Sequence, residues 1–242
     1  MKIGILVTDR VRSELVQEHG EYSDMFGRLL ARADPEAEFE NYDVERGPLP
    51  GSAAGRSDDC DGYLVTGSRY SVYDDLDWIV RLEGFLRRLI EDHRPLFAVC
   101  FGHQLVAQAL GGSVEKAGRG WTLGLQTTSI ASPFPWADSA TSRLNLIHSH
   151  QDQVVGLPEG AVLVGSNDAC PISMYRIGGH VMSCQGHPEF SPDYARQLYD
   201  ARRELFGEEL WHEARESLDG RSDEKLVARW AMDFFSAGGR PR

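Results

Sequence analysis

Short apolar runs alternate with amphipathic stretches along the 242 residues of this chain. The amphipathic stretches place apolar residues near helical spacing, which indicates helices that bury one side. This alternation predicts an α/β fold with a doubly wound, flavodoxin-like mixed sheet flanked by helices. The predicted strands are Ile3–Val7, Glu38–Asp43, Gly62–Thr66, Leu96–Val99, Leu123–Ile130, Leu144–His148, Ala161–Ser166, Ile172–Arg176 and His180–Gln185. The predicted helices lie within Ser13–Ala33 and over Trp78–Ile90, Gly102–Leu110, Pro192–Phe206 and Ser222–Phe235.

The pattern runs through the chain without an internal repeat or a domain-separating linker. Gly, Pro and Ser cluster in residues 45–58, a composition that is typical of a loop. A chain of this length can bury one large sheet. We therefore expect a single domain that covers residues 1–242.

Composition and charge narrow the classes of partner. Apolar residues make up 41% and charged residues 26%, which is ordinary for a globular protein. The net charge of −12 argues against nucleic acid and anionic membranes as partners. Since no run approaches the ~18 apolar residues of a membrane-spanning helix, and the run from Met1 to Val7 is too short for a signal peptide, no membrane role is expected. Four widely spaced cysteines do not suggest a disulfide framework, so a reducing cytoplasm is the expected setting.

A lone cysteine, Cys100, ends the apolar run Leu96–Val99 and comes directly before a helical segment. A strand that turns sharply into a helix exposes the residue at the turn and aims the first N–H groups of the helix at it. A thiol at this position lies in a positive field, which enriches the nucleophilic thiolate. The alternative is a buried core cysteine, which is common among free thiols.

A second segment, Gln185–Phe190, supplies the groups that a thiol nucleophile needs. Pro188 favours an extended backbone at His187, and side chains at positions i and i+2 of an extended chain project to the same side. Glu189 can therefore orient the His187 ring while the other ring nitrogen exchanges a proton. Nucleophile, base and orienting carboxylate form a catalytic triad. A surface turn that carries His and Glu by chance is the alternative for this segment alone.

Metal binding is the main rival for the same side chains. Cys100 and His103 have the spacing of half a zinc site, and His148, His150, Cys184 and His187 could be recruited to it. A structural zinc site usually shows two paired spacings, and only one is present here. We therefore expect no metal. No phosphate-binding loop or dinucleotide fingerprint is visible, so no cofactor is expected either.

Taken together, the motifs resemble those of the class I, triad-type glutamine amidotransferases. The nucleophile motif of that family corresponds to Ala98–Gln104 and its His-Pro-Glu motif to His187–Glu189. Tyr63–Ser68 resembles its oxyanion loop, and Ser149–Val154 its Ser-His-x-Asp-x-Val segment. Gly67–Asp74 is similar to the stand-alone, GMP-synthase-like branch that includes the γ-glutamyl peptidases. Two departures, Ala98 and Ser68 in place of glycines, affect the expected substrate more than the chemistry.

The resemblance implies a Cys-His-Glu hydrolase that forms a γ-glutamyl thioester on Cys100 and releases glutamate with ammonia or an amine. It implies that His187 and Glu189 complete the triad. It also implies that the Gly67 and Phe101 amides hold the oxyanion, and that Gln104, Ser149 and His150 bind the glutamyl group. The expected partner is a small γ-glutamyl substrate, glutamine or a γ-glutamyl peptide. Three alternatives stay open: a free-standing hydrolase, a glutaminase subunit of a separate synthetase, and a non-catalytic binding or regulatory protein. A homo-oligomer also stays open.

Overall fold

The computed structural model describes residues 1–51, 59–132, 134, 136–137 and 140–238, so residues 52–58 of the predicted loop lie outside the described part. The strands are β1 (Lys2–Val7), β2 (Glu38–Asp43), β3 (Gly62–Val65), β4 (Leu96–Val99), β5 (Ser113–Lys116), β6 (Thr122–Ile130), β7 (Arg143–His150), β8 (Asp152–Gly156), β9 (Ala161–Ser166), β10 (Met174–Ile177) and β11 (Val181–Cys184). The helices are α1 (Ser13–His19), α2 (Tyr22–Ala31), α3 (Asp77–Glu91), α4 (Phe101–Ala109), α5 (Pro192–Asp200), α6 (Arg203–Phe206), α7 (Glu208–Ser217) and α8 (Glu224–Ser236).

Nine strands form one mixed sheet in the order β2-β1-β3-β4-β11-β10-β9-β6-β7. The half from β2 to β11 is parallel, and the half from β11 to β7 is antiparallel. β5 and β8 form a separate two-stranded sheet. The predicted α/β class with a mixed sheet is confirmed. No helix in the described part of the chain is long and apolar enough to cross a membrane.

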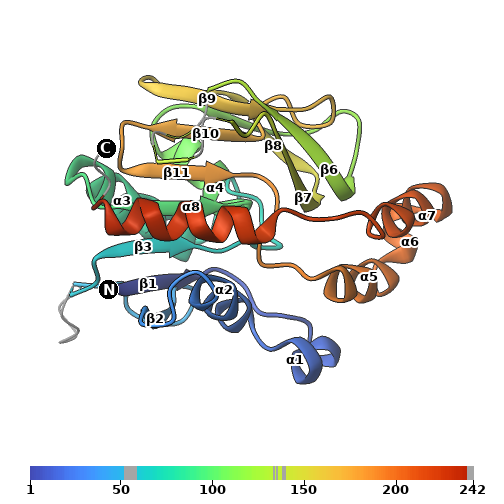
Figure 1. Cartoon of the computed structure of the whole chain (residues 1–242), viewed down its shortest axis with the longest axis horizontal. Coiled ribbons are helices and arrows are strands. Elements are labelled where there is room, and N and C mark those ends of the chain that lie inside the picture. Colours follow the sequence, from blue (N-terminus) through green and yellow to red (C-terminus); the bar gives the residue numbers. More distant parts are fainter. Residues whose placement is uncertain (52–58, 133, 135, 138–139, 239–242) are drawn as a thin grey trace.

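Helices cover both faces of the parallel half, with α2 and α8 on one side and α3 and α4 on the other (Figure 1). Alternate residues of one strand point to opposite faces, so each central strand contributes side chains to two buried clusters. Ile3 and Phe97 pack with the α2 and α8 side chains, while Tyr63 and Leu96 pack with those of α3 and α4. These strands are buried on both faces, which explains why they read as continuous apolar runs.

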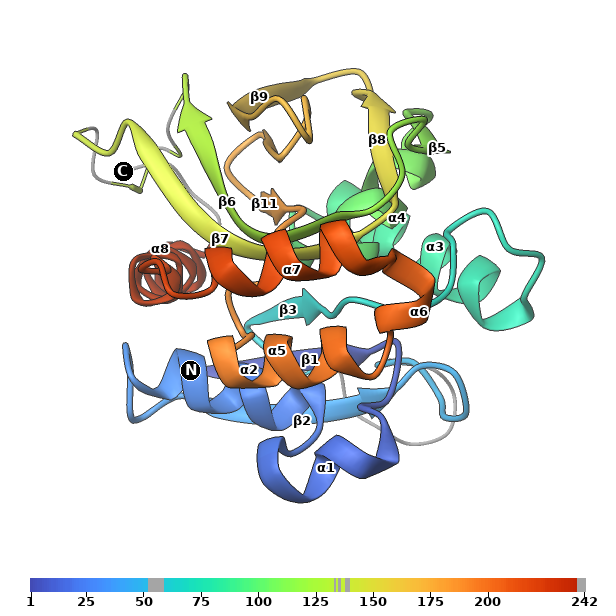
Figure 2. The same cartoon turned by 90° about the vertical axis from the view of Figure 1, so that its right-hand side faces the viewer.

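The carboxyl ends of the parallel strands meet at one edge of the sheet, where ligands bind in open α/β folds. The helices α5, α6 and α7 lie beyond this edge in Figure 1 and in front of the sheet in Figure 2. A third buried cluster joins them to the sheet and includes Phe190, Tyr194 and Leu198. The carboxyl edge of the main sheet therefore faces the group formed by α5, α6 and α7.

Some predicted elements differ from the observed ones. The stretch Ser13–Ala33 holds two helices, because α1 ends before Gly20. A new helix, α2, begins after Glu21, whose N–H donates to the Asp24 carboxylate at 2.8 Å. The predicted helix Pro192–Phe206 is likewise two helices, α5 and α6. The prediction missed α7 entirely; along it only Ala214 is buried, while Leu210 and Trp211 are partly buried against the same cluster. It also missed β5 and β8.

Candidate active site

Cys100 is the single residue between β4 and α4, at the sharp strand-to-helix turn that the sequence predicts. Its backbone has φ 51° and ψ −101°. A non-glycine residue in such a region costs about 1–3 kcal/mol and persists only where its surroundings hold it. Here the Cys100 N–H donates to the Cys184 carbonyl (2.9 Å) and the Cys100 carbonyl accepts the Gln104 N–H (3.0 Å). The neighbouring strand and helix thus fix the thiol at the sheet edge.

Close packing of α4 against β3 sets the direction of this turn. A β-carbon at Gly102 would lie 2.8 Å from the Val65 β-carbon and 2.9 Å from the Val65 carbonyl oxygen. Any side chain at Gly102 would push the helix away from the strand and move Cys100 with it. Ala98, one of the departures from the family motif, is fully buried in β4.

His187 and Glu189 form the predicted pair. His187 Nδ1 lies 2.8 Å from Glu189 Oε1, and the Glu189 side chain is fully buried. The His187 N–H donates to the Ile147 carbonyl (2.8 Å), which holds the segment against β7 in an extended form. Glu189 Oε2 has no hydrogen-bond partner among the described residues. Among the described residues, the imidazole of His187 is therefore the hydrogen-bond partner of the Glu189 carboxylate.

The electrostatics of the pair favour an imidazolium at His187. Burial acts to lower the pKa of His187, but the charges of Glu189 and Cys100, together with hydrogen bonds to both side chains, outweigh it and raise this pKa to about 10. His187 is therefore hydrogen-bonded to Glu189 and lies close enough to Cys100 for the two charges to interact.

The His187 ring is packed on one face by Phe190 and approached at its Cε1 edge by Gly67. The Phe190 ring stacks on it with centroids 4.0 Å apart and an interplanar angle of 10°. On the Gly67 side, a β-carbon at that glycine would lie 2.8 Å from His187 Cε1 and 3.4 Å from Cys100 Cβ. The loop after β3 therefore comes as close to the ring and the thiol as a backbone without a side chain permits.

The two predicted oxyanion residues border the same point. Phe101 opens α4, so its N–H has no acceptor within the helix, and among the described residues it has no other backbone acceptor. The Gly67 carbonyl accepts the Thr8 hydroxyl (2.7 Å), and the Ser68 hydroxyl donates to the Thr8 carbonyl (3.0 Å). Thr8 at the end of β1 thus anchors the loop that carries Gly67. Sequence analysis did not single out Thr8, which carries no motif of its own.

Gln104 is connected to the nucleophile through a second amide. Gln104 Nε2 donates to Gln185 Oε1 (3.0 Å) and to the Asp152 carbonyl (2.7 Å). Gln185 Nε2 donates in turn to Cys100 Sγ at 3.4 Å. Gln104 is only 3% exposed, which excludes a solvated helix-surface role. Gln185 was missed as a site residue, although it stands two residues before His187.

Ser149 and His150 lie at the end of β7 and are less directly connected to the triad. The Ser149 hydroxyl has no hydrogen-bond partner among the described residues. His150 Nε2 lies 3.2 Å from Gln153 Nε2, and burial together with the neighbouring histidines His148 and His187 holds its pKa well below the ordinary value. Within the described part of the chain, neither residue is hydrogen-bonded to Cys100.

The loop after Gly67 closes onto Asp152, which sequence analysis placed within the Ser149–Val154 segment without a role of its own. The Ser71 hydroxyl lies 2.5 Å from Asp152 Oδ2, and the Tyr73 hydroxyl lies 3.0 Å from Asp152 Oδ1. The backbone carbonyl of Asp152 also accepts the Gln104 amide, so this residue joins the Gly67 loop, β8 and α4 beside the nucleophile. Only long-range contacts create this arrangement.

The residues of the zinc alternative have other surroundings. His103 is fully buried and lies 3.0 Å from the Ser183 hydroxyl and 3.1 Å from the Ile172 carbonyl. Both ring nitrogens of this histidine thus have protein partners, and burial lowers its pKa to about 3. A neutral imidazole with two protein partners is a structural core histidine.

One triplet of possible metal-binding side chains occurs within the described residues, at Glu40, Asp59 and Cys60. The Lys2 ammonium lies 2.6 Å from Glu40 and 2.9 Å from Asp59. A cation of the protein therefore already occupies the space between the two carboxylates.

Comparison with known proteins adds to this geometry. Residues 37–201 match the family model described as glutamine amidotransferase class-I. Gamma-glutamyl peptidase 3 of Arabidopsis thaliana is 29% identical over 91% of this chain and 85% of that protein. A gamma-glutamyl-L-1-hydroxyisopropylamide hydrolase of Pseudomonas is 30% identical over 76% of this chain and 65% of that protein.

A similar fold is found among solved structures. The crystal structure of a glutamine amidotransferase from Methylobacillus flagellatus superposes with a TM-score of 0.76, at 22% identity. The alignment covers 100% of this chain and 96% of that one. At 22% identity, this similarity shows that the two chains share an α/β fold.

Proposed function

This chain belongs to the class I glutamine amidotransferase family and is an enzyme, and from that premise we propose that it hydrolyses a γ-glutamyl compound with Cys100 as nucleophile. One observation carries the proposal: Cys100 stands on a strained turn beside His187, whose other ring nitrogen is 2.8 Å from Glu189. Geometry of this kind is the recognisable feature of triad catalysis on unrelated folds.

In the proposed reaction, the Cys100 thiolate attacks the γ-carbonyl carbon and forms a C–S bond. The carbonyl electrons move to the oxygen, and the Gly67 and Phe101 amides stabilise the resulting oxyanion. Loss of one such donor typically costs about 2.7–4 kcal/mol of transition-state stabilisation. As the tetrahedral intermediate collapses, the C–N bond breaks and His187 gives its proton to the departing ammonia or amine.

Hydrolysis of the thioester completes the cycle. His187, now neutral, takes a proton from water, and the hydroxide adds to the thioester carbonyl carbon. Collapse breaks the C–S bond, releases glutamate and restores the Cys100 thiolate beside the imidazolium. Glu189 orients the ring and stabilises its charge in both half-reactions. Gln104 and Gln185 hold the thiol and the adjoining pocket wall through their amide chain.

A stand-alone hydrolase is the form of the proposal that the curated relatives favour, since those named above are a peptidase and a hydrolase of γ-glutamyl bonds. A glutaminase subunit that feeds a synthetase is the second candidate. Burial favours it, because Cys100 and His187 are each only 5% exposed and docking of a partner could open the site.

The test is release of glutamate by the purified chain from glutamine, glutathione and γ-glutamyl dipeptides. Turnover of at least one compound without a partner is expected for the wild type, and none for Cys100→Ser. Cys170→Ser is the matched control and should retain turnover, since Cys170 lies outside the proposed machinery. Silence on every compound, with activity on addition of a synthetase, would favour the subunit.

Iodoacetamide labelling separates the chemistry from the choice of substrate. Cys100 should be alkylated first, because burial raises the pKa of Cys60, of Cys184 and, to about 12, of Cys170. Equal labelling of all four thiols in the folded protein would contradict an activated nucleophile.

A further inference from the structure

A cavity of about 690 Å³ opens on the side of Glu189 that faces away from Cys100. Its walls are the end of α2, the start of α8 and the segment Pro188–Pro192 that continues from His187. Five basic side chains line it: Arg28, Arg32, Arg221, Lys225 and Arg229. We call it the cationic cavity, and we propose that it binds a small polyanion, a ligand with several phosphate or carboxylate groups.

The cationic cavity is lined by more basic than acidic side chains, although the molecule as a whole carries a net negative charge. The chain has 37 acidic and 25 basic residues, so an acidic lining would be expected by chance. Three acidic residues do line it, but two are already engaged. Glu189 is paired with His187, and Asp223 Oδ2 accepts the Asn145 N–H at 2.9 Å. The Asp223 carboxylate keeps its charge in that hydrogen bond, but the five cations still outnumber Asp223 and Glu224.

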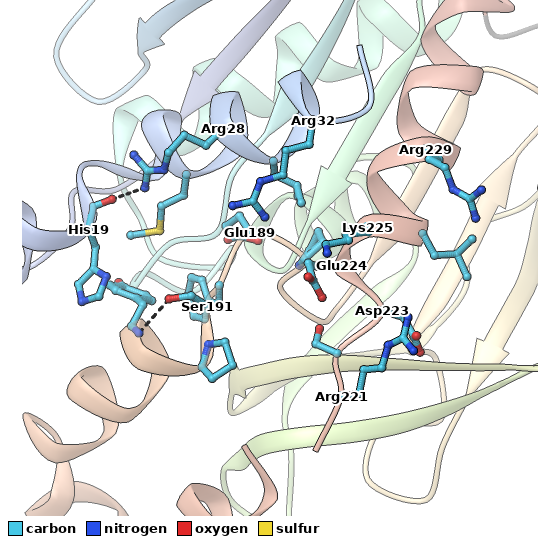
Figure 3. Close-up of a pocket in the computed structure, with 18 residues that line it drawn as sticks. His19, Arg28, Arg32, Glu189, Ser191, Arg221, Asp223, Glu224, Lys225 and Arg229 are labelled. Carbon is cyan, nitrogen blue, oxygen red and sulfur yellow. Dashed lines mark hydrogen bonds between the residues drawn. The ribbon is translucent and has the colours of Figure 1, made fainter. Parts of the chain in front are cut away.

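Within the described part of the chain, the five cations have no acidic side chain as an ion-pair partner. The Arg28 guanidinium donates instead to the His19 carbonyl. Figure 3 shows Arg28 on α2, Arg32 directly after it, and Lys225 and Arg229 on α8, with Glu189 between the two helices. Elements about 200 residues apart in sequence thus bring unpaired positive charge to one concave surface.

Placement of the cations at the start of α8 is unfavourable in the free protein. The N-terminus of a helix carries a partial positive charge, which favours acidic and not basic side chains. Arg221 precedes α8 by three residues and Lys225 is its second residue. The Asp223 carboxylate makes no capping bond to this helix. An anion in the cavity would offset both the side-chain charges and the helix dipole.

The chemical class of ligand follows from the lining. Four of the five cations are arginines, whose planar guanidinium groups bind phosphate and carboxylate oxygens in pairs. The cavity has the volume of a small-molecule site. Met25, Leu29 and Leu226 add apolar surface, so an organic group carrying the charges can be held as well. A long nucleic acid is disfavoured by the net charge of −12.

The test is calorimetric titration of the whole chain at fixed, low ionic strength, with pyrophosphate in one arm and citrate in the other. Saturable binding is expected in at least one arm, and the arm that binds identifies phosphate or carboxylate as the source. Arg32→Glu and Lys225→Glu should each weaken binding by about tenfold or more. Arg88→Glu is the matched control: it changes the net charge as Arg32→Glu does, but Arg88 is on α3, which covers the other face of the sheet. This variant should leave binding unchanged.

Two results would overturn the proposal: no saturable binding in either arm, or equal weakening by Arg88→Glu, which would reveal an effect of net charge alone. Circular dichroism shows whether each variant folds. If either Arg32→Glu or Lys225→Glu fails to fold, the other variant still tests the proposal. The readout is binding and not turnover, so the result is independent of γ-glutamyl hydrolysis. Because Glu189 lies between the cavity and His187, a ligand found there can next be added to the glutamate-release assay.

Discussion

At the scale of single residues, Glu189 tests whether the triad acts as a unit. Glu189→Gln keeps an acceptor for His187 Nδ1 but removes the charge that stabilises the imidazolium. We expect a lower kcat for glutamate release, with a loss smaller than that of His187→Ala, for which general acid–base catalysis sets a scale of about 10²–10⁴-fold. Cys100 alkylation should persist in Glu189→Gln. Wild-type turnover in this variant would reduce the triad to a dyad.

The titration of His187 is a second residue-scale prediction. Because Glu189 and Cys100 raise its pKa from the ordinary 6.5 to about 10, this imidazole should stay protonated across neutral pH, as NMR of the ring would show. Its contribution to the free energy of unfolding is then complete below pH 6.5 and disappears as the pH rises through about 10.

Variants of the two partners check the cause of this shift. Removal of either charge, in Glu189→Gln or Cys100→Ala, should move the His187 titration to lower pH. A ring that titrates near pH 6.5 in the wild type would contradict the contacts that we describe.

At the scale of elements, the loop after β3 must approach the triad without a side chain. Gly67→Ala would place a methyl carbon 2.8 Å from His187 Cε1, so the ring or the loop must move. We expect kcat to fall by about tenfold or more, since small misplacements of reacting groups are costly, while far-UV circular dichroism stays unchanged. Gly118→Ala is the matched control, because a β-carbon there meets nothing within 4 Å. Equal kinetics for the two variants would contradict the close approach.

Element-scale prediction succeeded where burial was strong and failed where it was weak. Leu96–Val99 is buried throughout, and its predicted bounds are those of β4. The strand β5 has only partly buried and exposed residues, and α7 buries a single one, so neither leaves a strong periodic signal in the sequence. The pairing of β5 with β8 arises from contact across the fold.

At the scale of the whole molecule, the single domain predicted for residues 1–242 has a direct test. One buried cluster joins Ile3 of β1, Phe97 of β4 and Phe234 of α8, so early and late segments share one core. We expect urea unfolding to give coincident transitions by tryptophan fluorescence and by far-UV circular dichroism. Two separate transitions, with one half of the sheet unfolding first, would divide the chain into two units.

The sequence by itself determined the local chemistry of this protein. An apolar strand running into Cys100 and a proline between His187 and Glu189 are short-range features, and backbone stereochemistry is enough to predict the turn and the paired side chains. Tertiary structure decided what surrounds them. The Gln104–Gln185–Cys100 chain, the Thr8 anchor and the cationic cavity each join residues far apart in the sequence. Such contacts depend on the order of strands and the packing of helices, and no local pattern encodes them.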